Sequence, residues 1–189
     1  MSMVNAGDQL RTVLRLRGRA PNVYAVLLRK CRADGTVSIG ASEFAEYHTS
    51  ALAYYRALRR IEAADLANVV KTPGKPTQLS GLAVELVANG GFIDMPERVF
   101  RQANRGGGGC FKTFLLAWEQ CKQAGLTKVT LNPEYYWDFG LTAKSVTYSL
   151  ARLRQLRLVQ TWPKRHRVVV EVLAGLSAWQ PGKGPTDGP

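Results

Sequence analysis

Histidine and cysteine are scarce in this chain, so few side chains can build a metal centre or a covalent catalytic site. Its 189 residues include two histidines, His48 and His166, and three cysteines. Two histidines far apart in the sequence cannot supply the metal-binding cluster of a DNA-nicking enzyme. No Ser-His-Asp or Cys-His pairing is indicated either. We therefore expect no enzymatic activity, no cofactor and no bound metal.

The three cysteines also argue against a disulfide framework, because their number is odd and none forms a CxxC pair. Cys31 and Cys121 fall at matching positions on the apolar sides of two predicted helices. Such positions are typical of small core residues. We expect buried free thiols.

Long hydrophobic runs are absent. No apolar stretch approaches the roughly 20 residues that span a bilayer, and four arginines, Arg11, Arg15, Arg17 and Arg19, interrupt the start of the chain where a secretory segment would be apolar. We expect no membrane partner and a cytoplasmic location.

A phosphate-binding loop is excluded although Gly106–Gly109 precede Lys112 and Thr113. That motif needs a glycine directly before the lysine so that backbone N–H groups can surround the phosphate. Phe111 occupies this position, so the glycines are interpreted as a flexible hinge.

Acidic residues are outnumbered, with 14 Asp and Glu against 26 Lys and Arg, a formal net charge of +12 and an isoelectric point near 10. The excess is greatest in residues 110–173, which hold ten cations and four acids. A balance of this kind favours a polyanionic partner.

An internal repeat organises the sequence. Apolar positions in the first half recur with a constant offset of 92 residues, and the matched pairs include Val37 and Val129, Phe44 and Tyr136, Leu58 and Leu150, Ile61 and Leu153, and Leu66 and Leu158. A change of offset by two residues brings in the preceding helix, where Tyr24 matches Phe114 and Leu28 matches Trp118. The chain therefore contains two copies of one domain.

Each copy has the order helix, short strand, helix, turn, helix and β-hairpin. We predict a basic N-terminal arm over 1–21, a first domain over 22–88, a Gly-rich joint over 89–109, a second domain over 110–173 and a disordered tail over 174–189. The arm could form a short basic helix or strand after Asp8, or stay flexible. Asn22 is predicted to cap the first helix of the first copy, and Ser50 to cap its third. The fold class is α+β and rich in helix.

The third helix of the second copy carries the candidate site. Val146, Leu150 and Leu153 form its buried stripe at 3.6 residues per turn. Its outward and flanking positions hold Lys144, Ser145, Thr147, Tyr148 and Arg152. The hairpin that follows concentrates Lys164, Arg165 and Arg167 at its tip. Hydrogen-bonding side chains suit base edges, and cations suit phosphates.

Residues 141–159, LTAKSVTYSLARLRQLRLV, resemble the recognition helix of winged-helix DNA-binding proteins, and residues 48–67, HTSALAYYRALRRIEAADLA, are similar. The resemblance implies two winged-helix domains in tandem, each with a recognition helix and a β-hairpin wing. The paired arrangement and the segment GGFIDMPERVF, residues 90–100, resemble plasmid replication initiators. That likeness implies a nucleoid- or plasmid-associated protein.

The first copy departs from this pattern, because its third helix has Leu52 where the second copy has Lys144. Five cations remain available for phosphates: Arg56, Arg59 and Arg60 on the helix, with Lys71 and Lys75 near the tip of the hairpin. The apolar start of the helix leaves self-association open as a second role.

The leading hypothesis is a protein that binds double-stranded DNA of a plasmid, phage or similar replicon, in replication initiation, partition or copy control, or transcriptional repression. Two alternatives stay open. Degenerate winged helices could form a protein-interaction module within a larger complex, and a basic hairpin also suits a structured RNA. A replication or segregation protein is a further possible partner.

Overall fold

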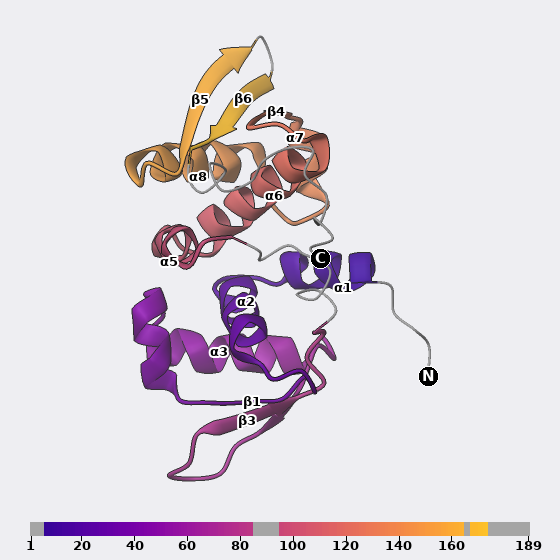
Figure 1. Ribbon diagram of the computed structural model, residues 1–189, viewed down its shortest axis with the longest axis vertical. Coiled ribbons are helices and arrows are strands. Elements are labelled where there is room, and N and C mark those ends of the chain that lie inside the picture. The colour runs from indigo at the N-terminus through magenta and orange to yellow at the C-terminus, as the bar shows by residue number, and fades with distance from the viewer. Residues whose placement is uncertain (1–5, 85–94, 165–166, 174–189) are drawn as a thin grey trace, which may run out of the picture.

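The computed structural model describes residues 6–84, 95–164 and 167–173. The fold is α+β. Two three-stranded antiparallel sheets lie at opposite ends of the long axis, and most of the helices lie between them (Figure 1). Within the described ranges no helix has both the length and the apolar character needed to cross a membrane. The expected disordered tail, 174–189, lies outside these residues.

The first repeat begins with α2 (Ala20–Lys30) and β1 (Val37–Ile39), followed by a 3-10 helix, η1 (Ala41–Tyr47). Helix α3 (Ala51–Glu62) then leads to the hairpin of β2 (Asn68–Val70) and β3 (Thr77–Ser80). The Ser50 side chain accepts a hydrogen bond from the Ala53 N–H, which confirms it as the cap of α3.

The second repeat has the same order: α6 (Gly108–Ala124), β4 (Lys128–Leu131), α7 (Pro133–Trp137), α8 (Ala143–Gln155), and a hairpin of β5 (Val159–Lys164) and β6 (Arg167–Val172). Thr142 caps α8 as Ser50 caps α3. Two further helices, α1 (Ala6–Arg15) and α5 (Glu97–Arg105), lie outside the repeated elements.

The two sheets have equivalent strand orders and equivalent pairing registers. The strand orders are β1-β3-β2 and β4-β6-β5. In the first sheet Val37 and Val69 both pair with Leu79. In the second, Val129 and Thr161, each 92 residues later, both pair with Val170. Because a slip of one residue would turn each strand over, the shared register places equivalent side chains on equivalent faces.

The helices of the two repeats bury matching residues. Leu58 and Ile61 of α3 are fully buried, and Leu150 and Leu153 of α8 occupy the corresponding core positions at 6% and 0% exposure. The aromatic residues expected inside the second repeat are also buried: Phe114, Trp118, Tyr136 and Phe139. Cys110 and Cys121 are buried free thiols, as expected, whereas Cys31 is only half-buried.

Two local expectations are wrong, and one open alternative is decided. Helix α2 begins at Ala20 with Pro21 in its first turn, so Asn22 is not a cap but a fully buried residue inside the helix. Of the forms open to the N-terminal arm, the structure has the helix, α1, whose Val13 and Leu14 are buried. Gly106–Gly109 form a packed corner between α5 and α6 rather than an open hinge, and Gly108 and Gly109 already belong to α6.

A buried polar contact joins the first repeat to α5, the helix that lies between the two repeats in the sequence. The Asn22 side-chain amide of α2 donates to Asn104 Oδ1 of α5 at 2.9 Å, and the Asn104 amide donates to the Phe100 carbonyl at 2.8 Å. Phe100 contacts Tyr47 of the first repeat and Phe111 of the second through edge-to-face ring pairs. Helix α5 therefore connects the two repeats into one continuous core.

Backbone contact at the junction depends on glycine. A Cβ at Gly108 would collide with the carbonyl of Gly18 in the loop between α1 and α2. Gly18 and Gly107 have φ values of +62° and +92°, a region that side chains other than glycine rarely adopt. These glycines let the first turn of α6 lie directly against the chain that enters α2.

Lys112 on α6 is buried, at 5% exposure. Its ammonium donates a hydrogen bond to the Phe139 carbonyl at 3.2 Å. Burial lowers the pKa of Lys112 to about 8, because the charged form loses its hydration.

Gly108→Ala should destabilise the protein by about 1–3 kcal/mol, since the added methyl group forces the backbone contact with Gly18 apart. Gly109→Ala is the matched control in the same helical turn, because its Cβ would meet only the Ser149 hydroxyl, at 3.5 Å. The control should be neutral or stabilising by up to about 1 kcal/mol. Urea unfolding measures both, and equal losses would contradict the junction packing.

Lys112→Met should remove a pH dependence of stability. Between pH 8 and 10.5 the unfolded chain carries the lysine proton and the folded protein does not, so the stability of the parent protein rises with pH across this window. At about 1.4 kcal/mol per pKa unit, the change amounts to about 3 kcal/mol.

Thermal unfolding of both proteins from pH 7 to 10 measures the effect. The variant should be the more stable at pH 7 and lose this advantage as the pH rises. Burial raises the pKa of Cys121 to about 11 and opposes the trend above pH 9, but this residue is present in both proteins. A pH-independent difference would contradict the lowered pKa of Lys112.

Candidate nucleic-acid interface

The outward face of α8 carries the residues predicted from the sequence. Lys144, Thr147 and Arg152 are exposed, and Tyr148 is 72% exposed, which is unusual for a large aromatic side chain. Val146, Leu150 and Leu153 face the core as expected. The helix therefore holds its polar side chains on a rigid base.

Two hydroxyl groups near the start of α8 donate to backbone carbonyls of the same segment. Ser145 Oγ donates to the Thr142 carbonyl at 2.8 Å, and Thr147 Oγ1 donates to the Ala143 carbonyl at 3.0 Å. Each oxygen keeps lone pairs that can accept a hydrogen bond. The Arg152 guanidinium donates to Gln155 on the same exposed face at 2.9 Å.

A shallow hollow of about 420 Å³ lies between the first turns of α6 and α8. Its lining combines Gly106, Gly109 and Cys110 of the glycine corner with Lys144, Ser145 and Tyr148 of α8. Both helices begin here, so their dipoles add positive potential to the lysine charge. The hollow is suited to an anionic group that approaches α8.

The hairpin tips lie far from each other. Lys71 and Lys75 are exposed at the tip of β2 and β3, at the opposite end of the molecule from the tip of β5 and β6 (Figure 1). In the second tip, the backbone of Lys164 pairs with that of Arg167 across the hairpin, and the Arg167 side chain is exposed. Arg165 lies outside the described residues.

The first repeat presents a different helix face. Arg56 and Arg59 of α3 are exposed, as is Leu52, at 60%. Arg60 has a structural contact, because its guanidinium donates to the Arg17 carbonyl at 2.7 Å. Of the three arginines predicted on this helix, Arg56 and Arg59 are the two without such a contact among the described residues.

Cations at the junction extend the charge of α8, and sequence analysis did not select them. Arg19 donates to the Asn104 carbonyl. Burial raises the pKa of the Cys110 thiol, whereas the positive charges of Arg152 and Arg19 lower it, so both arginines lie near this cysteine. The two arginines on either side of Gly18 were the available signal in the sequence. Their position in the fold depends on the contact between Gly18 and Gly108, which the sequence does not reveal.

His48, which ends η1, belongs to the same electrostatic environment. Burial lowers its pKa, and the charges of Arg105 and Arg19 lower it further. The cationic region defined by Lys144, Arg152, Arg19 and Arg105 therefore reaches from the second repeat to the first. No described acid forms a salt bridge with these four residues.

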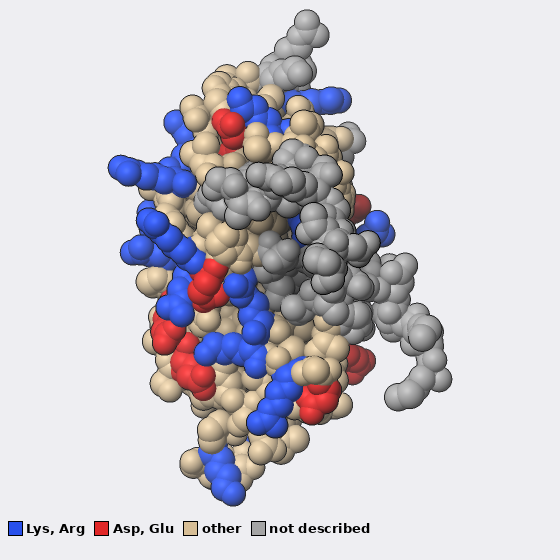
Figure 2. Space-filling model, in the orientation of Figure 1, with Lys and Arg blue, Asp and Glu red and all other residues tan. Residues whose placement is uncertain are grey.

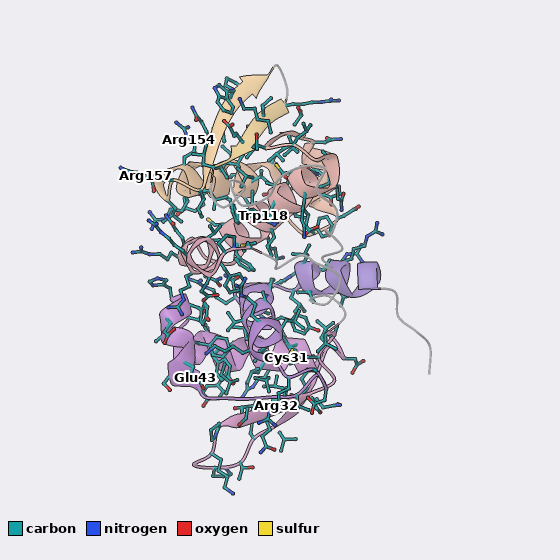
Figure 3. All side chains as sticks on the ribbon, in the orientation of Figure 1. Cys31, Arg32, Glu43, Trp118, Arg154 and Arg157 are labelled. Carbon is teal, nitrogen blue, oxygen red and sulfur yellow. The ribbon has the colours of Figure 1, made fainter. Side chains whose placement is uncertain are left out.

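Several cations outside this region are neutralised. Arg29 and Arg101 pair with Glu97 at 3.0 and 2.7 Å, and Lys30 pairs with Glu43 at 3.2 Å. On the face shown in Figure 2, acidic and basic side chains are interspersed. Arg154 and Arg157 extend outward from the C-terminal end of α8 and add to its charge (Figure 3). Among the described residues, no group of three or more His, Cys, Asp or Glu side chains could hold a metal ion.

No protein-family model, curated protein sequence or solved structure shows a significant match to this chain.

Arg105→Gln should raise the pKa of His48 toward its usual value, because it removes one of the two positive charges that disfavour the imidazolium. Proton NMR titration of the imidazole signals measures this shift, and His166 is the only other histidine of the sequence. Arg98→Gln removes an exposed arginine from the same helix and should leave the pKa of His48 unchanged. An unchanged pKa in both variants would show that Arg105 does not act on His48.

Proposed function

We propose that this chain is a DNA-binding protein built from two winged-helix domains in tandem, with α3 and α8 as recognition helices and the two hairpins as wings. The order of elements and the matched strand registers support this arrangement. In such a domain the recognition helix lies in the major groove and the hairpin contacts neighbouring phosphates.

One observation carries the proposal. The cations of α8 and the junction form no described salt bridge, whereas Arg29, Lys30 and Arg101 each pair with an acidic residue. The unpaired cations suit phosphate contacts. The exposed Tyr148 and the hydroxyl oxygens of Ser145 and Thr147 suit contacts with base edges. A surface with this composition supports duplex binding by the second repeat.

The biological role we propose is that of a replicon protein acting in replication initiation, partition or copy control, or repression. Selection of random duplexes with the purified protein, followed by sequencing, identifies the preferred site. Salt titrations on the selected duplex should then weaken binding with a log–log slope of about −0.9 per phosphate contact. Equal or tighter binding to a single strand or a structured RNA would favour the RNA-binding alternative.

Lys144→Ala and Tyr148→Ala should each cost roughly 1–3 kcal/mol on the selected duplex and much less on random DNA, because base contacts specify the sequence. Replacing Lys164, Arg165 and Arg167 together should weaken binding to both duplexes about equally and reduce the salt slope, because phosphate contacts do not depend on sequence.

Arg101→Ala is the charge-matched control. It removes one positive charge, but from a side chain that already pairs with Glu46 and Glu97. Its salt slope should equal that of the parent protein. If the α8 variants fold and keep full sequence discrimination, α8 does not contact bases, and the protein-interaction alternative becomes the better explanation.

A further inference from the structure

The two repeats differ at one core position beneath their third helices. With the offset of 92 residues, Tyr54 of α3 corresponds to Val146 of α8. Tyr54 is fully buried, and its ring lies 4.5 Å from that of Phe44, centroid to centroid. Its hydroxyl donates to the Ile39 carbonyl at 3.3 Å. The first repeat thus holds a complete phenol ring between its helix and its sheet.

In the second repeat a cavity of about 190 Å³ lies at the equivalent place. Four of the residues that line it match the residues that surround or form the ring site of the first repeat. In order, Leu131, Tyr136, Val146 and Val168 correspond to Ile39, Phe44, Tyr54 and Thr77. Valine is smaller than tyrosine, and neighbours in a packed core close such a space only in part.

The cavity is open at one side of α8. Ala143 and Thr147, both exposed, line its edge, whereas Leu131 and Tyr136 form its buried wall at 3% and 0% exposure. In the first repeat Tyr55 corresponds to Thr147, and its ring lies 5.1 Å from that of Tyr54. Replacement by threonine leaves the second cavity reachable from solvent.

The size and lining of the cavity define its ligand. An apolar cavity of about 150 Å³ can bind benzene, so 190 Å³ accommodates one six-membered ring with a small substituent. No charged side chain lines the cavity, and burial of an unpaired charge is costly. The Leu131 carbonyl corresponds to the Ile39 carbonyl, which accepts the hydroxyl proton of Tyr54.

We propose that this cavity is a binding site for a small, neutral, single-ring phenol, which occupies the place that Tyr54 fills in the first repeat. The site goes beyond the proposed DNA binding and does not depend on it. Its lining includes Val146 and Leu150 of α8, on the side of the helix opposite Tyr148.

Phenol itself is the probe, titrated into the intact protein with the methyl groups observed by NMR. Saturable shifts should centre on Val146, Leu150 and Val168, and the melting temperature should rise with phenol concentration. Benzene should bind more weakly because it lacks the hydroxyl donor, and benzoate more weakly still because its charge must lose hydration. Absence of saturable shifts at these methyl groups would overturn the proposal.

Val146→Tyr restores the residue of the first repeat. It should raise the melting temperature without ligand and abolish the response to phenol. Gln123→Tyr adds the same side chain at an exposed position of α6 and should leave the phenol response intact. Binding that persists in a folded Val146→Tyr protein would place the site elsewhere. If this variant does not fold, the methyl shifts of the parent protein decide the question.

Discussion

The direct backbone approach of Gly18 and Gly108 is the constraint on which the arrangement of the two repeats depends. It brings α6 against the start of α2, and it leaves the buried amide pair of Asn22 and Asn104 beside it. Neither glycine can carry a side chain in this geometry. A hydrogen-bonded amide pair in an apolar junction also disfavours other alignments, because a shift would leave buried polar groups without partners.

Much of the fold could be predicted from the sequence because the repeat is expressed in local patterns. Burial at Leu58 and Leu150 follows from helical periodicity, and the caps Ser50 and Thr142 lie directly before their helices. The outward position of Lys144 and Tyr148 follows from the same periodicity. The turn residues between the strands were sufficient to predict both hairpins.

The junction could not be predicted because its contacts join residues far apart in the chain. Asn22 follows a proline and resembles a cap, and only the amide of Asn104, 82 positions later, explains its burial. Four successive glycines resemble a linker until the carbonyl of Gly18 is placed against them. Arg60 has the spacing of a phosphate contact, yet the carbonyl of Arg17 engages it. Local periodicity contains none of this information.

The continuous core has a consequence for any partner that both repeats contact at once. Phe100 packs against rings from each repeat, so a rotation of one repeat against the other would separate Tyr47 and Phe111 from it. On a duplex, inserting one base pair between two contacted segments turns the second by roughly 35° about the helix axis. A linker of free chain could follow that turn, whereas a shared aromatic core cannot. If both repeats contact one duplex, the spacing of the two contacted segments is therefore fixed by the protein interior.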